Sequence, residues 1–166
     1  MGRSPEQTYM MGTAGFVTNR VIATVNANQV PGQKGRDMPH LTVEFSANLQ
    51  NQVDIFKLVE TVHQAALRTG VFEIAAVRTR AVGRDYYVIA DGHRDNAFVA
   101  ISVRVAPGRS PETRRRVGQE IFDAACEFLK NVYETTPLAI SLEVQEIDNT
   151  AAFRKKNLDT FVKRTI

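Results

Sequence analysis

Two arginines occupy positions at which a rigid backbone could present a guanidinium group to an anion. Arg78 lies inside an alternating segment typical of a strand, and Arg109 comes just before the expected start of a helix. Guanidinium groups bind carboxylates through two parallel hydrogen bonds, and the unpaired N–H groups at a helix start also favour negative charge. A structural ion pair is the more common role for an arginine in either position, so both roles stay open.

Other reactive side chains give weaker indications of chemistry. His63 falls on an expected helix, where a partly buried or surface histidine is the more common case, and His93 falls in a polar turn. Cys126 is the single cysteine and has no histidine placed to activate it, so a nucleophile is not expected. The sequence has no metal-ligand spacing, phosphate loop, nucleophile elbow or metalloprotease motif. We therefore expect neither a metal nor a cofactor.

The charge distribution argues against nucleic acid as a partner. The net charge is +3, but residues 38–166 hold 17 Lys and Arg against 16 Asp and Glu. The basic run Arg114–Arg116 is flanked by Glu112 and Glu120, which is typical of a solvated helix face. No apolar run approaches the roughly 20 residues that a bilayer span requires. With one cysteine and no secretory pattern, we expect a cytoplasmic protein. The two arginines favour a small-molecule carboxylate as its ligand, and we expect it to bind neither nucleic acid nor a membrane.

The composition of the chain changes near residue 38. Residues 1–37 are rich in Gly, Asn, Gln, Thr and Ser, and they finish in a linker-like segment over residues 31–37. Such a stretch adds little to a core, so we predict an N-terminal extension over 1–37 and one domain over 38–166. The extension could be a tag or a misassigned start, a flexible arm, or a strand added to a neighbouring subunit.

The first half of the predicted domain has the order strand, helix, strand. Apolar residues alternate over residues 41–45, which predicts a strand with one buried face. Three- and four-residue apolar spacing predicts a helix over residues 54–70, with an aspartate to cap its start and a glycine at its end. A second strand is predicted over Ile74–Val82, with Arg78 and Arg80 on the same face.

The second half repeats this order. Residues 99–105 alternate as a strand, Ser110 is placed to cap a helix, and an apolar stripe continues that helix over residues 117–132. A further strand is predicted over residues 138–144, and a short extra strand over Tyr86–Ala90 joins the two halves.

The repeated order predicts an α+β fold built from a duplicated βαβ unit. Two such units most simply form a four-stranded mixed sheet with two helices on one face and right-handed crossovers. The other sheet face would then be uncovered. A second layer supplied by other subunits is the natural way to cover it, so we expect an oligomer.

A series of short motifs starts at Met38 and continues through the second half of the domain. They are Met38-Pro39-His40-Leu41-Thr42-Val43-Glu44, Ala66-Leu67-Arg68-Thr69-Gly70-Val71-Phe72, Val77-Arg78-Thr79-Arg80, Ala90-Asp91-Gly92-His93-Arg94-Asp95, Ala97-Phe98-Val99, Gly108-Arg109-Ser110 and Leu138-Ala139-Ile140-Ser141-Leu142-Glu143-Val144. In this order they resemble the 5-carboxymethyl-2-hydroxymuconate isomerases of the tautomerase superfamily. The resemblance covers essentially all of residues 38–166.

This resemblance implies a tautomerase-like fold, a homotrimer and an isomerase that needs no cofactor or metal. It implies that Pro39, as an amino-terminal residue, is the general base and acid. Arg78 and Arg109 would bind substrate carboxylates, with Arg80 as a weaker addition. The implied reaction converts the dienol 5-carboxymethyl-2-hydroxymuconate to its 2-oxo-ene tautomer in homoprotocatechuate (4-hydroxyphenylacetate) degradation.

Two departures from the family pattern leave alternatives open. Pro39 follows Met38 in this chain, so its nitrogen is a tertiary amide unless translation starts at Met38 and that methionine is removed. Residues 82–87 also differ from the tryptophan-bearing segment of the family, which leaves the substrate open. The alternatives are a tautomerase acting on another enol or 2-hydroxydienoate, and a non-catalytic oligomeric binding protein in which Pro39 is not amino-terminal.

Overall fold

The structure of the protein is a computed structural model that describes residues 38–162. Its elements in chain order are β1 (His40–Ser46), η1 (Ala47–Leu49), α1 (Ile55–Arg68), β2 (Arg78–Arg84), β3 (Ala97–Val105), α2 (Pro111–Thr135), β4 (Leu138–Glu146), η2 (Asn149–Ala151) and η3 (Leu158–Thr160). The predicted extension over 1–37 lies outside the described residues and stays a prediction. Among the helices that are described, none has the length and apolar character needed to cross a membrane.

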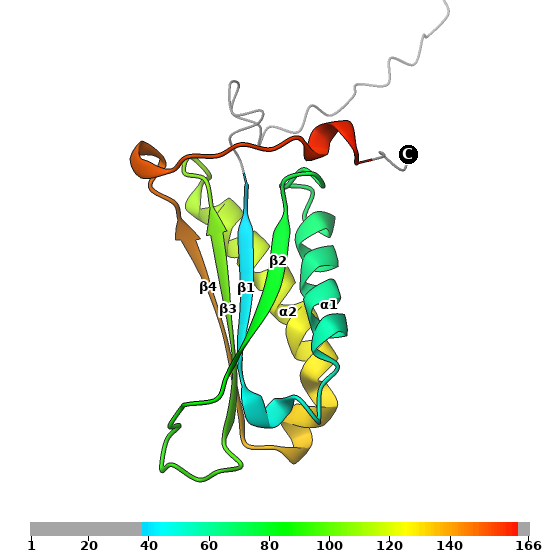
Figure 1. The fold of residues 1–166 in the computed structure, drawn as a ribbon, viewed down its shortest axis with the longest axis vertical. Helices are drawn as coiled ribbons and strands as arrows, with labels where there is room; N and C mark the ends of the chain where they lie inside the picture. Colours follow the sequence, from blue (N-terminus) through cyan, green and yellow to red (C-terminus); the bar gives the residue numbers. More distant parts are fainter. Residues whose placement is uncertain (1–37, 163–166) are drawn as a thin grey trace, which may run out of the picture.

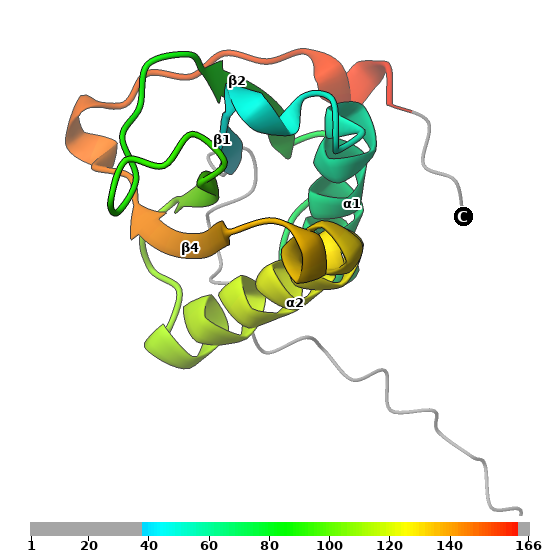
Figure 2. The same cartoon turned by 90° about the horizontal axis from the view of Figure 1, so that it is seen from below.

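The four strands form one sheet in the order β2-β1-β3-β4. β1 pairs with β2 in parallel, β3 pairs with β4 in parallel, and β1 and β3 are antiparallel neighbours. Both long helices lie on the same face of the sheet (Figure 1, Figure 2). This arrangement confirms the predicted duplicated βαβ unit, with a four-stranded mixed sheet and two helices on one face.

Capping residues in the sequence explain where both long helices begin. The Asp54 carboxylate accepts a hydrogen bond from the Lys57 N–H at 3.0 Å, and the Ser110 hydroxyl accepts one from the Thr113 N–H at 3.2 Å. These contacts satisfy N–H groups that have no partner within the first helical turn. Gly70 follows α1 with a φ of +68°, a conformation that glycine adopts without steric cost.

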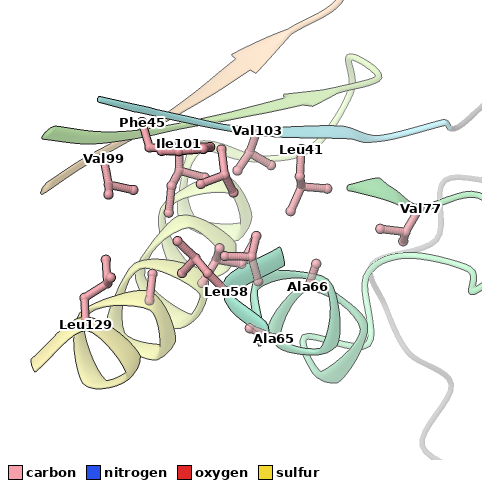
Figure 3. Packing of buried hydrophobic residues seen from close by; sticks show 14 of the residues in the cluster. Leu41, Phe45, Leu58, Ala65, Ala66, Val77, Val99, Ile101, Val103 and Leu129 are labelled. Carbon is pink, nitrogen blue, oxygen red and sulfur yellow. The ribbon is translucent and has the colours of Figure 1, made fainter. Parts of the chain in front are cut away.

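The hydrophobic core lies between the sheet and the two helices (Figure 3). Alternate residues of the two central strands face the helices, as the two-residue period of a strand requires. Side chains less than 2% exposed include Leu41 and Val43 of β1, Val99 and Val103 of β3, Leu58 and Val62 of α1, and Ile121 and Leu129 of α2. Burial of this apolar surface is the main force that holds the helices on the sheet.

The strand predicted over Ile74–Val82 begins later than its apolar pattern suggested. β2 starts at Arg78, and residues 73–76 lie in a turn region instead. The register gives the reason, because Arg78 pairs with His40, which is the first residue of β1. Residues upstream of Arg78 have no neighbouring strand to pair with, so alternation alone does not make them a strand.

The short strand predicted over Tyr86–Ala90 is wrong. Residues 85–96 form a loop at one end of the sheet, seen below the strands in Figure 1. The loop is held by side-chain contacts, among them a hydrogen bond from the Asn96 amide to the Ile89 carbonyl at 3.0 Å. Val88 is 85% exposed. Its apolar character therefore does not mark a buried strand face.

Gly118 lets α2 approach β4 closely. A Cβ atom added at Gly118 would lie 3.0 Å from Cγ2 of Val144. We expect Gly118→Val to lower the free energy of unfolding by about 1–3 kcal/mol, because the added atoms push the helix and strand apart. Urea unfolding measures the change. Gln119→Val, at the next and exposed position, places the same side chain on α2 away from β4, and an equal loss in both variants would contradict the packing explanation.

Candidate active site

One end of the sheet brings together the residues selected from the sequence. β1 and β2 begin at this end, and the antiparallel pairing of β1 with β3 means that β3 finishes here. Pro39 directly precedes β1, is buried, and its carbonyl accepts a hydrogen bond from the Arg78 N–H at 3.1 Å. Arg109 lies in the loop that follows β3. The fold therefore places Pro39, Arg78 and Arg109 at the same end of the sheet.

Arg78 and Arg80 face the side of the sheet that the helices leave open. Thr79, between them, faces the helices, since its hydroxyl lies 2.9 Å from Nδ1 of His63 on α1. Alternation along the strand then directs both arginines to the opposite side, as predicted. Nη1 of Arg78 donates to the Ala76 carbonyl at 2.6 Å, which orients the half-buried guanidinium. His63 is a partly buried histidine, in agreement with its predicted structural role.

Arg109 is a partly buried cation held on several sides. Its Nη1 donates to the Ala106 carbonyl at 3.0 Å, and its guanidinium carbon lies 5.3 Å from the centre of the Phe72 ring. Burial lowers the pKa of the Arg109 guanidinium, and the Glu146 carboxylate partly offsets this effect. Arginine nevertheless keeps its charge. A cation that has lost part of its hydration attracts an anion more strongly than a fully solvated one does.

His40 is a site residue that sequence reasoning missed. As the first residue of β1 it pairs with Arg78 on one side and Arg104 on the other, so all three share the open face. The sequence signal for this site is alternation, which places residues 40 and 104 on the face of the sheet away from the buried apolar residues of their strands. Burial, followed by the positive charges of Arg80, Arg78, Arg104 and Arg154, lowers the pKa of His40 below its ordinary value.

The contact between His40 and Arg80 fixes the tautomer of the imidazole. Nη1 of Arg80 lies 3.3 Å from Nδ1 of His40. A guanidinium can only donate, so Nδ1 accepts and carries no proton. The neutral ring then has its proton on Nε2, which leaves one donor for another group.

The basic run on α2 behaves as a solvated helix face, as predicted. Arg116 pairs with Glu120 at 2.7 Å, and Arg114 pairs with Glu146 at 2.9 Å. Arg115, between them, is exposed. These pairs neutralise much of the positive charge that a phosphate backbone would need.

The remaining reactive side chains lie away from Pro39 or lack activation. Burial and the Asp123 carboxylate raise the pKa of the Cys126 thiol, which disfavours the reactive thiolate. His93 lies in the loop over residues 85–96, at the other end of the sheet. Across residues 38–162, no group of three His, Cys, Asp or Glu side chains is placed to hold a metal ion.

Comparison with known proteins identifies the family. Residues 39–162 match the family described as 5-carboxymethyl-2-hydroxymuconate isomerase. A relative from Escherichia coli, named 5-carboxymethyl-2-hydroxymuconate Delta-isomerase, is 32% identical over 126 residues, which cover 76% of this chain and 100% of the relative. The chain belongs to the 5-carboxymethyl-2-hydroxymuconate isomerase family. Membership confirms the resemblance seen in the sequence, and with it the prediction of an isomerase.

Solved structures of this isomerase family have the same fold. A 5-carboxymethyl-2-hydroxymuconate isomerase from Deinococcus radiodurans R1 is 27% identical with a TM-score of 0.69, and the match covers 76% of this chain and 96% of that one. A second structure, of a 5-carboxymethyl-2-hydroxymuconate delta-isomerase, is 24% identical with a TM-score of 0.72, covering 78% and 95%. The tautomerase-like fold predicted for the isomerase domain is therefore confirmed.

His40 should make the stability of this isomerase depend on pH. Its pKa in the folded protein lies below the ordinary value of 6.5, so the unfolded chain takes up the proton first as the pH falls. We expect the free energy of unfolding to decrease as the pH falls below about 6.5, and to decrease less in His40→Gln. Urea unfolding at pH 7.5 and 5.5 measures both. The same loss in the two proteins would assign the effect to other groups.

Proposed function

We propose that this chain converts the dienol 5-carboxymethyl-2-hydroxymuconate to its 2-oxo-ene tautomer, as a step of homoprotocatechuate degradation. The observation that carries the proposal is that Pro39 and Arg78 lie side by side where β1 and β2 begin, with the Arg78 backbone N–H donating to the Pro39 carbonyl at 3.1 Å. Arg109 lies at the same end of the sheet. The named activity of the relative from Escherichia coli supports the choice of substrate.

In the proposed reaction, the amine of Pro39 transfers one proton from oxygen to carbon. It takes the proton of the 2-hydroxyl group while the electron pairs shift along the dienol to form a C2 carbonyl and a C3–C4 double bond. The protonated amine then returns the proton to C5, so atoms and charge balance and Pro39 is regenerated. A free α-amino group has a pKa of about 8, and nearby arginines disfavour its protonated form, which suits a base near neutral pH.

The arginines in this proposal bind the carboxylates and stabilise the developing charge. Arg78 and Arg109 would each hold a carboxylate of the conjugated dienol, and Arg80 would add positive charge beside them. Charge-assisted hydrogen bonds of this type are about twice as strong as neutral ones. A fixed guanidinium also favours the dienolate formed during transfer, because it needs no reorientation at that moment.

A homotrimer forms part of the same proposal. The helices cover one face of the sheet (Figure 2). Alternation along the strands puts Arg78, Arg80 and the exposed Ala139 and Ser141 of β4 on the other face. Neighbouring subunits facing this side would shield the reacting groups from water, which strengthens every electrostatic contact in the site. Sedimentation analysis of the purified protein measures the number of subunits, and a monomer at the concentrations used for assays would contradict the trimer.

The proposed base requires Pro39 to be the first residue. We expect protein translated from Met38, with that methionine removed, to isomerise the tricarboxylic dienol, and the full chain to be inactive because its Pro39 nitrogen is an amide. Loss of the dienol absorbance measures the rate, and circular dichroism of both proteins controls for folding. Equal activity of the two forms would exclude Pro39 as the base.

Intact mass spectrometry of the protein from its native host settles which form exists. A mass that includes residues 1–37 would contradict the enzyme mechanism. It would favour instead a non-catalytic oligomeric binding protein with the same arginines. A mass beginning at Pro39 would agree with the proposed isomerase.

Arg78→Ala and Arg109→Ala should each lower kcat/KM for the tricarboxylic dienol by at least about 10-fold, or ~1.4 kcal/mol, because each removes a carboxylate partner. The variants are made in the form that begins at Pro39. Arg115→Ala removes the same charge from an exposed position of α2 and should leave the rate unchanged. Unchanged kinetics in either test variant would remove that arginine from the site.

A further inference from the structure

The open face of the sheet carries more positive charge beside Pro39 than the proposed mechanism uses. His40 has an arginine as its cross-strand partner on each side, Arg78 in β2 and Arg104 in β3. Arg80, two residues along β2, reaches the same imidazole at 3.3 Å. Three arginines therefore surround one neutral histidine at this end of the sheet.

These arginines are not neutralised by the part of the protein that the structure describes. Among residues 38–162, no carboxylate pairs with Arg78, Arg80 or Arg104. The residue opposite Arg104 on β4 is Gln145, whose amide donates to the Glu143 carboxylate at 3.0 Å. Like charges on neighbouring strands destabilise a sheet. Such an unpaired cluster is therefore expected to bind an anion.

Elsewhere on the same face, an arginine is paired with a carboxylate. At the far end of β1 and β2, Arg84 contacts the Glu44 carboxylate at 2.9 Å. This side-chain hydrogen bond lowers the pKa of Glu44, as expected for a carboxylate that stays charged. The two ends of one strand pair thus differ, with an internal counter-ion at one and none among the described residues at the other.

A further cation comes from the C-terminal segment. Residues 147–162 cross the sheet at the end where β1 begins, shown in orange to red at the top of Figure 1. Arg154 in this segment is partly buried, and its Nη2 donates to Oδ1 of Asn149 at 2.8 Å. Its charge acts on His40 together with that of Arg104. The cluster therefore draws its charged groups from the three strands β1, β2 and β3 and from the crossing segment.

We propose that Arg104, Arg154 and His40 form a second carboxylate subsite, which binds the carboxymethyl group of a tricarboxylic substrate. This inference rests on the proposed function and extends it. Arg78 and Arg109 are assigned to the two carboxylates conjugated with the dienol, so the third carboxylate needs partners of its own. The two arginines supply its charge, and Nε2–H of His40, whose orientation Arg80 fixes through Nδ1, supplies a neutral donor. The subsite determines specificity for a third carboxylate and takes no part in proton transfer.

The kinetic test compares substrates that differ by the carboxymethyl group. In the form that begins at Pro39, Arg104→Gln and Arg154→Gln should each raise KM for 5-carboxymethyl-2-hydroxymuconate at least about 10-fold, with kcat little changed. KM for 2-hydroxymuconate, which has two carboxylates, should stay within about twofold because it leaves this subsite empty. Arg115→Gln is the matched control. Equal effects on both substrates, or no effect on either, would overturn the subsite.

A binding test on the full chain does not depend on catalysis. The probe is tricarballylate, a saturated tricarboxylate, with glutarate as the dicarboxylate control. Tricarballylate should shift the imidazole signals of His40 in NMR spectra more than glutarate does, and Arg104→Gln should remove the difference. The His93 signal, from the distant loop, is the internal reference. If the enzyme assay fails but this difference is seen, the subsite stands and the proposed reaction falls; no difference would overturn the subsite.

Discussion

One hydrogen bond, from the Arg78 N–H to the Pro39 carbonyl, begins the pairing on which the candidate site depends. It lies next to the first cross-strand pair of β1 and β2, so it sets which residues of the two strands are opposite each other. Because side chains alternate strictly along a strand, a shift of one residue would turn Arg78 and Arg80 toward the apolar core. The buried row that includes Leu41 opposes such a shift. The packing of the core therefore also fixes the face of the sheet on which Arg78 and Arg80 lie.

The electrostatics of the site have a cost that the rest of the fold must offset. Burial, followed by the positive charges of neighbouring arginines such as Arg80 and Arg104, lowers the pKa of His40 and so disfavours its protonated form. A soluble sheet ordinarily intersperses charges of both signs, as Arg84 and Glu44 do on the same face. The region beside Pro39 lacks this balance within the described residues. Stability given up in this way is typical of a surface shaped for a charged ligand.

Features set by residues close together in the chain can be predicted from the sequence, whereas the ends of strands and the contacts between distant strands cannot. Asp54 and Ser110 cap their helices through contacts three residues away, so the sequence contains the whole interaction. The start of β2 and the loop over residues 85–96 depend on where another strand begins or ends. The proximity of His40 and Arg104 likewise follows from an antiparallel register that no local pattern specifies. The family motifs supplied Arg109, whose sequence position alone fits an ion pair equally well.

The carbonyl group and the nitrogen of Pro39 have separate roles. The carbonyl of Pro39 is held in the sheet by Arg78, whereas its nitrogen takes no part in that ladder, since proline has no N–H to donate. The acyl group on the nitrogen can thus be replaced by a single hydrogen, which gives the neutral secondary amine, without altering the strand pairing. Under the proline mechanism, a protein with a purification tag or leader fused upstream of Pro39 would fold and assemble normally but would have no catalytic activity. Proteolysis at that one junction would then switch the finished enzyme on.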